Sequence, residues 1–508
     1  MTGAPGRPEH RRAEVPAGRP ATPADDLAAR ASETPSATAL SWDGGRWSYG
    51  RLDAGAAMLA NRFRARGAVP GEAVTLCATP GADAVAALFG LWRSGCVAVP
   101  LHQRLTTSEV RRARQIVMSN LHIDNYTLHK TSGSAGSSVP RGVQGGIAAA
   151  AGGVGRQRRY SGFPEVGTLI LTSGSSGAPR AIGFTRDTLA ASAAAVGRRL
   201  GLTAADRWGL CLSPGHIGGL ALIVRAVMNG SSVRLWPSFD AGAVVRSVLG
   251  GKVTHLAVVP LMLRRILGRL GGESVPPTLR GVLVGGAAAS RALLDEAWAA
   301  GLPVATTWGM TETSSQIATA PPALAREHPG TAGPPLHGVE VRRDPAGVLC
   351  VRGPTLASMV VHGPGALPEP LATDSEGWFA TRDLGRVDRD GLVWIEGRAD
   401  AMIVSGGLKV SPAEVERVIE TLPGVREAVV FGLPDEEWGE VVAAVVEGDP
   451  RRVTPAAVDR HCRGRLVRGR CPTRTVVVDE MPRTWTGKVM RSRVREGLGP
   501  GLGARSET

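Results

Sequence analysis

The 508-residue sequence has few aromatic residues and few lysines. With 3 Tyr and 7 Phe available for base stacking, and with scattered arginines, the net charge of +14 does not indicate a nucleic-acid-binding surface. The six cysteines show no CxxC pair and no metal-ligand spacing, which is typical of a reducing compartment. The apolar stretch 220–224 ends at Arg225, and no run of 18 apolar residues predicts a membrane span. We therefore expect a cytoplasmic protein without nucleic-acid or membrane partners.

Helical and extended patterns alternate through most of the chain. Residues 52–66 and 82–92 carry apolar residues at helical spacing. Short apolar runs typical of strands lie between and after them, among them 73–77 and 281–284. This alternation predicts a large layered α/β domain over residues 24–399. One helix pattern, 412–422, with strand patterns at 428–431, 441–446 and 475–478, predicts a smaller α+β domain over 400–497. The polar ends, 1–23 and 498–508, are expected to be a disordered leader and tail.

A loop of small and hydroxyl residues follows the apolar run 166–171. Residues 172–180 read Thr-Ser-Gly-Ser-Ser-Gly-Ala-Pro-Arg. Glycines let backbone N–H groups approach an anion, hydroxyls add donors, and Arg180 adds fixed positive charge. The loop lacks the spacing of the Walker pattern, so it predicts a different phosphate site, with a flexible Gly/Ser linker as the alternative. The candidate phosphate-binding residues are Thr172, Ser173, Gly174, Ser175, Ser176, Gly177 and Arg180.

Residues 119–163 do not follow the alternating pattern. They are rich in Gly, Ser and Ala, and they contain a degenerate copy of the phosphate loop at 131–141. No apolar strand precedes that copy, so we interpret it as a decoy. A divergent loop and a locally scrambled reading frame both account for the segment.

Three further segments accompany the phosphate loop. They are 307–313 (Thr-Trp-Gly-Met-Thr-Glu-Thr), 381–385 with 397–400 (Thr-Arg-Asp-Leu-Gly and Gly-Arg-Ala-Asp), and 482–488 (Pro-Arg-Thr-Trp-Thr-Gly-Lys). In order and spacing the four segments resemble the adenylate-forming superfamily, which includes the acyl-CoA synthetases. The resemblance covers about residues 25–497. It implies the adenylate-forming fold: the large α/β domain, with the smaller domain acting as a mobile lid.

The resemblance also implies ATP, Mg²⁺ and coenzyme A as ligands, and the positive field of the chain would favour such anions. Asp383 would accept the ribose hydroxyls and Arg398 would support ribose and phosphate. Trp308, where the family has Tyr or Phe, would stack on adenine. The segment with Gly285 and Gly286 would line the acyl and adenine pockets, Gly285 toward the acid and Gly286 toward ATP. Thr311 would contact the α-phosphate, and Glu312 would be the magnesium ligand. Arg180 replaces the usual lysine, which keeps the charge but changes its shape.

The remaining matches lie at the junction with the lid and within it. Asp400 stands at the family hinge, where Ala401 replaces a frequent second acid. Lys488 matches the lysine that stabilises charge at the reacting carboxylate and the α-phosphate during adenylation. Gly406 and Gly407 would face the thiol tunnel after the lid has pivoted.

Two segments resemble a narrower group, the o-succinylbenzoate–CoA ligases of menaquinone biosynthesis. They are 213–225 and 309–319. Arg225 interrupts an apolar helical pattern, where an unpaired charge is costly, and the second carboxylate of o-succinylbenzoate would pair with it. An arginine that reaches solvent or pairs internally is the alternative. His216 either lines the acyl entrance or is a packed structural histidine.

These observations predict an ATP-dependent acid–CoA ligase, with o-succinylbenzoate as the expected acid. A ligase for another aryl or medium-chain acid is the first alternative. A non-catalytic nucleotide-binding relative is the second, and the presence of Glu312, Asp383 and Lys488 argues against it. The expected partners are small-molecule substrates, and a homodimer is left open.

Overall fold

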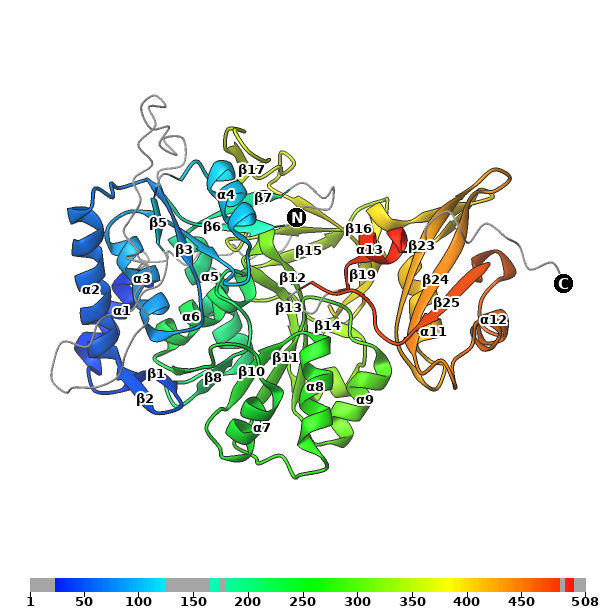
Figure 1. Ribbon diagram of the computed structural model, residues 1–508, viewed down its shortest axis with the longest axis horizontal. Helices are drawn as coiled ribbons and strands as arrows, with labels where there is room; N and C mark the ends of the chain where they lie inside the picture. The colour runs from blue at the N-terminus through cyan, green and yellow to red at the C-terminus, as the bar shows by residue number, and fades with distance from the viewer. Residues whose placement is uncertain (1–22, 120, 124–164, 173–178, 485–488, 498–508) are drawn as a thin grey trace, which may run out of the picture.

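The computed structural model describes residues 23–119, 121–123, 165–172, 179–484 and 489–497, and within these ranges the strands form four sheets. Three sheets belong to the larger part of the molecule and one to the smaller part (Figure 1). Most of the predicted leader, the tail and residues 124–163 of the irregular segment lie outside the described residues. The mixed α/β architecture with a smaller C-terminal domain confirms the predicted fold class.

An eight-stranded sheet runs in the order β13-β12-β11-β10-β8-β9-β1-β2. Its neighbours from β12 to β1 pair in parallel, and β13 and β2 close its edges in antiparallel fashion. Parallel strands covered on both faces are expected to be mostly apolar, and β10 and β11 are buried along their whole length, with His255 as the one ionisable residue among them. The bounds are β1 Thr38–Trp42, β2 Gly45–Ser48, β8 Arg207–Leu210, β9 Ser232–Leu235, β10 His255–Val258, β11 Gly281–Val284, β12 Val304–Met310 and β13 Ser315–Ala320.

A seven-stranded sheet runs in the order β18-β17-β7-β6-β4-β3-β5. Its parallel half, β5-β3-β4-β6, meets an antiparallel half at the β6–β7 hairpin, which carries the predicted phosphate loop. The bounds are β3 Ala73–Cys77, β4 Val97–Leu101, β5 Leu121–Ile123, β6 Val166–Thr172, β7 Arg180–Thr185, β17 Met359–Val361 and β18 Glu369–Pro370.

Helices α5 (Arg186–Leu200) and α6 (Ile217–Asn229) lie between these two sheets (Figure 1). One apolar cluster runs from the seven-stranded sheet through both helices to the eight-stranded sheet. A helix covered on all sides should be apolar all round, and the interior of α6 is buried from Gly219 to Val227. Arg225 belongs to that buried stretch, so the chain places a cation in the central layer.

A five-stranded antiparallel sheet, β14-β20-β19-β16-β15, completes the larger part. The fourth sheet, β22-β21-β24-β23 with β25 beside β24, forms the smaller part over its own apolar clusters. The short helix η2 (Ala399–Ala401) joins the two parts. The bounds are β14 Thr331–Gly333, β15 Glu340–Arg343, β16 Val348–Arg352, β19 Phe379–Val387, β20 Val393–Arg398, β21 Ile403–Ser405, β22 Leu408–Val410, β23 Val425–Asp435, β24 Gly439–Gly448 and β25 Arg474–Val478.

The remaining helices pack against the sheets and against one another, and among the described residues no helix has the length and apolar character of a membrane span. Helix α11 ends at Ile419 rather than at residue 422, because the Thr421 hydroxyl donates to the Val418 carbonyl and Pro423 disfavours helix before it. The bounds are α1 Pro23–Glu33, α2 Tyr49–Ala65, α3 Ala82–Arg93, α4 Thr107–Ile116, α7 Ala241–Leu249, α8 Pro260–Leu270, α9 Arg291–Ala299, α10 Pro322–Glu327, α11 Pro412–Ile419, α12 Pro455–Arg463 and α13 Arg491–Glu496.

Candidate functional site

The stem of the predicted phosphate loop is a hairpin. Thr172 at the end of β6 pairs with Arg180 at the start of β7, so the two residues close the loop from opposite sides. Thr172 Oγ1 and Arg180 Nε are buried and have no hydrogen-bond partner among the described residues. Buried polar atoms are normally paired, so this stem presents groups that a phosphate oxygen could satisfy. The loop residues Ser173, Gly174, Ser175, Ser176 and Gly177 lie outside the described residues.

Arg180 also connects two predicted segments that lie far apart in sequence. Its guanidinium forms an ion pair with the carboxylate of Glu312, which lies in the short helix η1 (Thr311–Thr313). Glu312 is only 8% exposed, so its carboxylate is buried rather than solvated. The stem of the predicted phosphate loop therefore lies beside Glu312, the predicted magnesium ligand.

The backbone that follows η1 is strained. Ser314 and Ser315, directly after η1, have positive φ values of 54° and 93°, which non-glycine residues rarely adopt. Opposite them the β12–β13 pair has a bulge at Gly309. A Cβ atom at Gly309 would lie 1.7 Å from the Ser315 carbonyl oxygen, so the close approach requires glycine. Strain of this kind clusters at functional sites, where surrounding packing maintains it.

Gly309→Ala should therefore destabilise the protein by about 1–3 kcal/mol or more, because the added methyl group meets backbone that has to move. Gly268→Ala is the matched control. Gly268 lies in α8 with no atom within 4 Å of the added carbon, and alanine should stabilise that helix by up to about 1 kcal/mol. Thermal unfolding of the two variants measures the difference. An unchanged melting temperature in Gly309→Ala would show that the bulge relaxes freely.

Asp383 and Trp308 lie side by side. The Trp308 indole N–H donates to Asp383 Oδ2 at 2.7 Å, and Arg398 donates to Oδ1 at 2.9 Å. Asp383 is 8% and Trp308 7% exposed, and the Trp308 ring packs in the cluster between β13 and the five-stranded sheet. The tryptophan that the sequence assigns to adenine therefore also orients the carboxylate assigned to ribose.

Arg398 bridges Asp383 and the predicted hinge residue. It donates to both carboxylate oxygens of Asp400, at 3.1 and 2.9 Å. This hydrogen-bonded pairing lowers the pKa of Asp400 and raises the pKa of Arg398. Asp400 lies in η2, at the junction of the two parts. The arginine thus couples the carboxylate predicted to bind ribose to the point at which the smaller part begins.

Gly285 and Gly286 follow β11, beside the start of the Trp308 segment. A Cβ at Gly285 would lie 2.7 Å from the Thr307 methyl carbon, and Gly286 has a φ of 78°. Both positions therefore exclude larger residues for steric or conformational reasons. This close packing is compatible with a flat ligand against the backbone, as the sequence predicts.

Arg225 is 2% exposed and reaches the same region from α6. It donates to Gln316 Oε1 at 2.9 Å, and its guanidinium lies 5.3 Å from the centre of the Trp208 ring. Among the described residues no carboxylate lies within ion-pair distance of it, and Arg225 Nε has no partner. Burial lowers the pKa of Arg225 to about 9, so it stays positive at neutral pH. A solvent-reaching arginine does not fit this arrangement, and the internal pairing that the structure shows is with uncharged groups, the Gln316 amide and the Trp208 ring.

Asp206, the acidic residue beside His255, is already satisfied. It accepts from Thr254 Oγ1 at 3.0 Å and from Arg280 at 2.6 Å. His255, stacked on Trp208 at 4.8 Å, has its pKa lowered to about 4 by burial and is neutral. The positive charge of Arg225 therefore lacks a counter-charge in its own surroundings.

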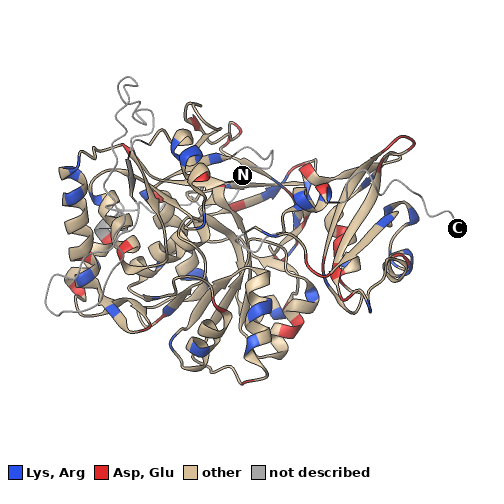
Figure 2. Cartoon of the chain, in the orientation of Figure 1, with Lys and Arg blue, Asp and Glu red and all other residues tan. Residues whose placement is uncertain are grey.

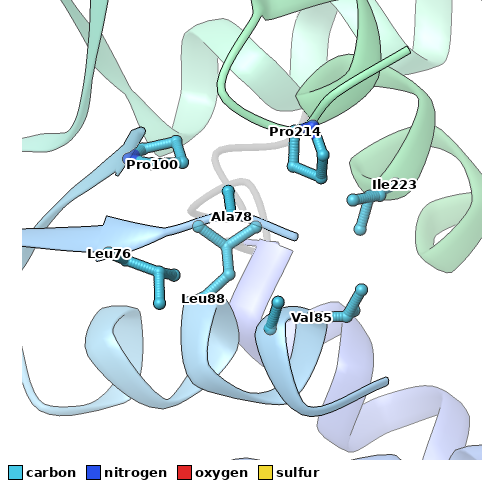
Figure 3. Close-up of a pocket in the computed structure, with 8 residues that line it drawn as sticks. Leu76, Ala78, Val85, Leu88, Pro100, Pro214 and Ile223 are labelled. Carbon is cyan, nitrogen blue, oxygen red and sulfur yellow. The ribbon is translucent and has the colours of Figure 1, made fainter. Parts of the chain in front are cut away.

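His216 is the residue directly before α6, and its ring centre lies 6.0 Å from that of His102. Burial lowers the pKa of His216 to about 3, so it is neutral at physiological pH. Nearby, an apolar cavity of about 10 Å³ lies between α3, β3 and the start of α6, lined by residues such as Leu76, Pro214 and Ile223 (Figure 3). That volume holds about one water, so we interpret it as a packing gap rather than as an acyl pocket.

The residues predicted to face coenzyme A form the turn between β21 and β22. Gly406 and Gly407 have φ values of 54° and 79°. The Trp438 ring, 50% exposed, lies so close to Gly406 that a Cβ would be 2.4 Å from it. Both glycines are thus on the surface of the smaller part, beside an exposed aromatic ring.

Lys488 lies outside the described residues, but the chain on either side is described. Arg483 and Val489 form a β-bridge, and the Met490 N–H donates to the Pro482 carbonyl at 2.8 Å. Arg483 pairs with Glu447 at 2.7 Å and with Glu427 at 2.8 Å. The described residues on either side of Lys488 are therefore paired with each other on the smaller part.

Two residues of the site were not predicted from the sequence: Gln316 and Trp208. Gln316 lies within the segment that resembles the ligases, but a neutral amide carries no signal of its own. Trp208 is an apolar strand residue by pattern. Only the contacts of Arg225 identify them.

The side chains of the site can be compared with the ligands that Mg²⁺ requires. Among the described residues no group of three or more His, Cys, Asp or Glu could hold a metal ion by itself. Mg²⁺ is usually bound by one or two carboxylates together with substrate phosphates, so a single buried Glu312 beside the phosphate-loop stem fits this cation. Figure 2 shows Lys and Arg distributed over both parts of the molecule.

Comparison with known proteins agrees with this geometry. The AMP-binding enzyme family matches residues 27–361, and the AMP-binding enzyme C-terminal domain matches 414–488. The 2-succinylbenzoate–CoA ligase of Geobacillus kaustophilus (strain HTA426) is 33% identical over 92% of this chain and 96% of its own. That of Listeria monocytogenes serotype 4b (strain F2365) is 30% identical over 92% and 98%.

Solved structures of o-succinylbenzoate CoA synthetase (MenE) from Bacillus subtilis have the same fold. The complex with the acyl-adenylate intermediate OSB-AMP has a TM-score of 0.78 at 28% identity, covering 93% of this chain and 98% of that one. The complex with ATP and magnesium ion has a TM-score of 0.78 at 27% identity, covering 93% and 99%. The chain therefore belongs to the adenylate-forming AMP-binding enzymes, with 2-succinylbenzoate–CoA ligases among its relatives.

Proposed function

We propose that the protein is an ATP-dependent, AMP-forming ligase that converts o-succinylbenzoate to o-succinylbenzoyl-CoA. The observation that carries this assignment is Arg225, a fully buried cation without a counter-charge among the described residues. An acid with a second carboxylate would supply that counter-charge when it binds. The relatives named for 2-succinylbenzoate support the same acid.

For ATP, we propose that Thr172 and Arg180 with the loop between them hold the β- and γ-phosphates. Asp383, fixed by Trp308 and Arg398, would accept the ribose hydroxyls. Thr311 would donate to the α-phosphate. Glu312 would hold Mg²⁺, which supplies positive charge to the phosphates when bound.

In the first half-reaction a carboxylate oxygen of the acid attacks the α-phosphorus of ATP. The bond from that phosphorus to the pyrophosphate oxygen breaks, which gives the acyl-adenylate and pyrophosphate. We propose that Lys488 stabilises the negative charge on the phosphorus oxygens, and that Arg180 stabilises the departing pyrophosphate. In the second half-reaction the thiol of coenzyme A loses its proton and attacks the acyl carbon, and AMP departs.

The lid movement between these steps follows from the same proposal. The larger domain would span 24–399 and the lid 400–497, and this boundary falls in η2. Asp400 would be the hinge, released or held by Arg398, and Gly406 and Gly407 would line the thiol path afterwards. We further propose a cytoplasmic location, and a homodimer remains an expectation that light scattering would test.

The test is pyrophosphate–ATP exchange with a panel of acids. The panel contains o-succinylbenzoate, its analogue without the ring carboxylate (4-oxo-4-phenylbutanoate), benzoate and a medium-chain fatty acid. We expect exchange to be fastest with o-succinylbenzoate. Faster exchange with a monocarboxylic acid would favour the alternative ligase, and absence of exchange with every acid would favour a non-catalytic nucleotide-binding protein.

Glu312→Gln should raise the magnesium concentration needed for half-maximal activity, because a neutral amide is a poorer ligand for a hard cation. It also leaves Arg180 without its carboxylate partner. Titration of Mg²⁺ at fixed ATP measures the shift, with Glu33→Gln on exposed α1 as the control. If the two variants share one magnesium dependence, Glu312 is not a ligand.

A further inference from the structure

The hydrogen bonds of the Gln316 side-chain amide determine which of its two ends faces Arg225. Its Nε2 donates to Thr319 Oγ1 at 2.8 Å and to Thr307 Oγ1 at 3.2 Å. The Thr307 hydroxyl itself donates to the Ala318 carbonyl at 2.9 Å, so it can only accept from the amide. The oxygen of Gln316 therefore faces Arg225.

This contact restrains the guanidinium without neutralising it. Gln316 is 4% exposed and carries no charge, and the face of Trp208 offers a second uncharged contact. A cation over an aromatic face is stabilised while its charge remains available. Arg225 Nε and Trp208 Nε1 are both buried donors without an acceptor among the described residues.

The position of Gln316 links Arg225 to the nucleotide side of the site. Gln316 lies on β13 and pairs with Gly309 on β12, the strand that carries Trp308. Thr307, the acceptor of its amide, packs against Gly285. Arg225 is thus oriented by the same strand pair that leads into Thr311 and Glu312.

We propose that Gln316 is a positioning residue that aims Arg225 at the second carboxylate of the acid, and that selectivity for a dicarboxylic acid depends on the neutrality of this amide. The inference rests on the proposed function. A carboxylate at this position would form an internal ion pair with Arg225 and take the place of the carboxylate of the substrate. The same shape with a negative charge should therefore remove the selectivity.

Gln316→Glu tests this directly. We expect its KM for o-succinylbenzoate to rise at least about thirty-fold, the lower end for loss of a desolvated charge pair. The KM for 4-oxo-4-phenylbutanoate and for ATP should change little, and kcat at saturating acid should stay near that of the unchanged protein. Gln115→Glu, the same substitution on the exposed surface of α4, is the matched control.

Gln316→Leu separates the effect of an added negative charge from the effect of losing the hydrogen bond that orients Arg225. It leaves Arg225 positive but without its hydrogen bond, so we expect a smaller rise in KM for the dicarboxylic acid than with glutamate. Equal losses with both acids in Gln316→Glu would indicate general damage to the fold and would overturn the inference. An unchanged KM for o-succinylbenzoate would also overturn it.

The two proposals fail in different ways. If the unchanged protein does not prefer o-succinylbenzoate over its analogue, the proposed function is wrong. If it does, and Arg225→Ala loses the preference while Gln316→Glu keeps it, the function stands and the role of Gln316 is wrong.

Discussion

Lys488→Ala is expected to block formation of the acyl-adenylate while leaving thioester formation from preformed acyl-adenylate near normal. The oxygens on the α-phosphorus gain negative charge as the carboxylate attacks, and a positive side chain stabilises that charge. Loss of one well-placed donor of this kind typically costs about 10²- to 10³-fold in rate. The thiol step breaks an acyl bond and needs no such charge at phosphorus. The loss should therefore be confined to the first half-reaction.

Two assays separate the half-reactions: pyrophosphate release from acid and ATP, and thioester formation from synthetic acyl-adenylate and coenzyme A. Lys252→Ala, an exposed lysine in the larger part, is the control and should be active in both. Equal loss of both activities in Lys488→Ala would contradict the assignment of this lysine to adenylation.

Much of the fold could be predicted from the sequence because its strands are locally apolar. Residues 73–77 form β3 and 281–284 form β11 within the predicted bounds. Where the apolar pattern does not give the correct bounds of a strand, pairing with a neighbouring strand sets them. Strand β23 extends from Val425 to Asp435, well beyond the apolar residues 428–431, because its pairing with β24 continues to Asp435 and Gly439, on either side of the turn 436–438.

The site residues could be predicted one motif at a time, but their contacts could not. Arg180 and Glu312 are 132 positions apart, and no local pattern indicates that they pair. Trp308 could be expected near a nucleotide, yet its hydrogen bond to Asp383 depends on how the five-stranded sheet packs on β12. Such long-range hydrogen bonds follow from the packing of whole elements.

Arg225 is the position at which sequence and structure argue most directly for the substrate. Arg225→Ala should raise the KM for o-succinylbenzoate while leaving the parameters for ATP near normal. Loss of one partner of a desolvated charge pair costs about 2–5 kcal/mol, which is roughly thirty-fold to several thousand-fold in apparent affinity. The unchanged protein should show a similar penalty with 4-oxo-4-phenylbutanoate, and the variant should show little further loss with that analogue.

Stability provides an independent signature of the same role. A buried charge without a partner is costly, and an apolar side chain of similar volume is often neutral or stabilising in its place. Arg225→Met should therefore melt at the same or a higher temperature than the unchanged protein while it loses affinity for the dicarboxylic acid. Arg62→Met on the exposed face of α2 is the control for the substitution itself. A variant that unfolds early and treats both acids alike would show instead that Arg225 supports the structure, and the assignment to o-succinylbenzoate would lose its main physical support.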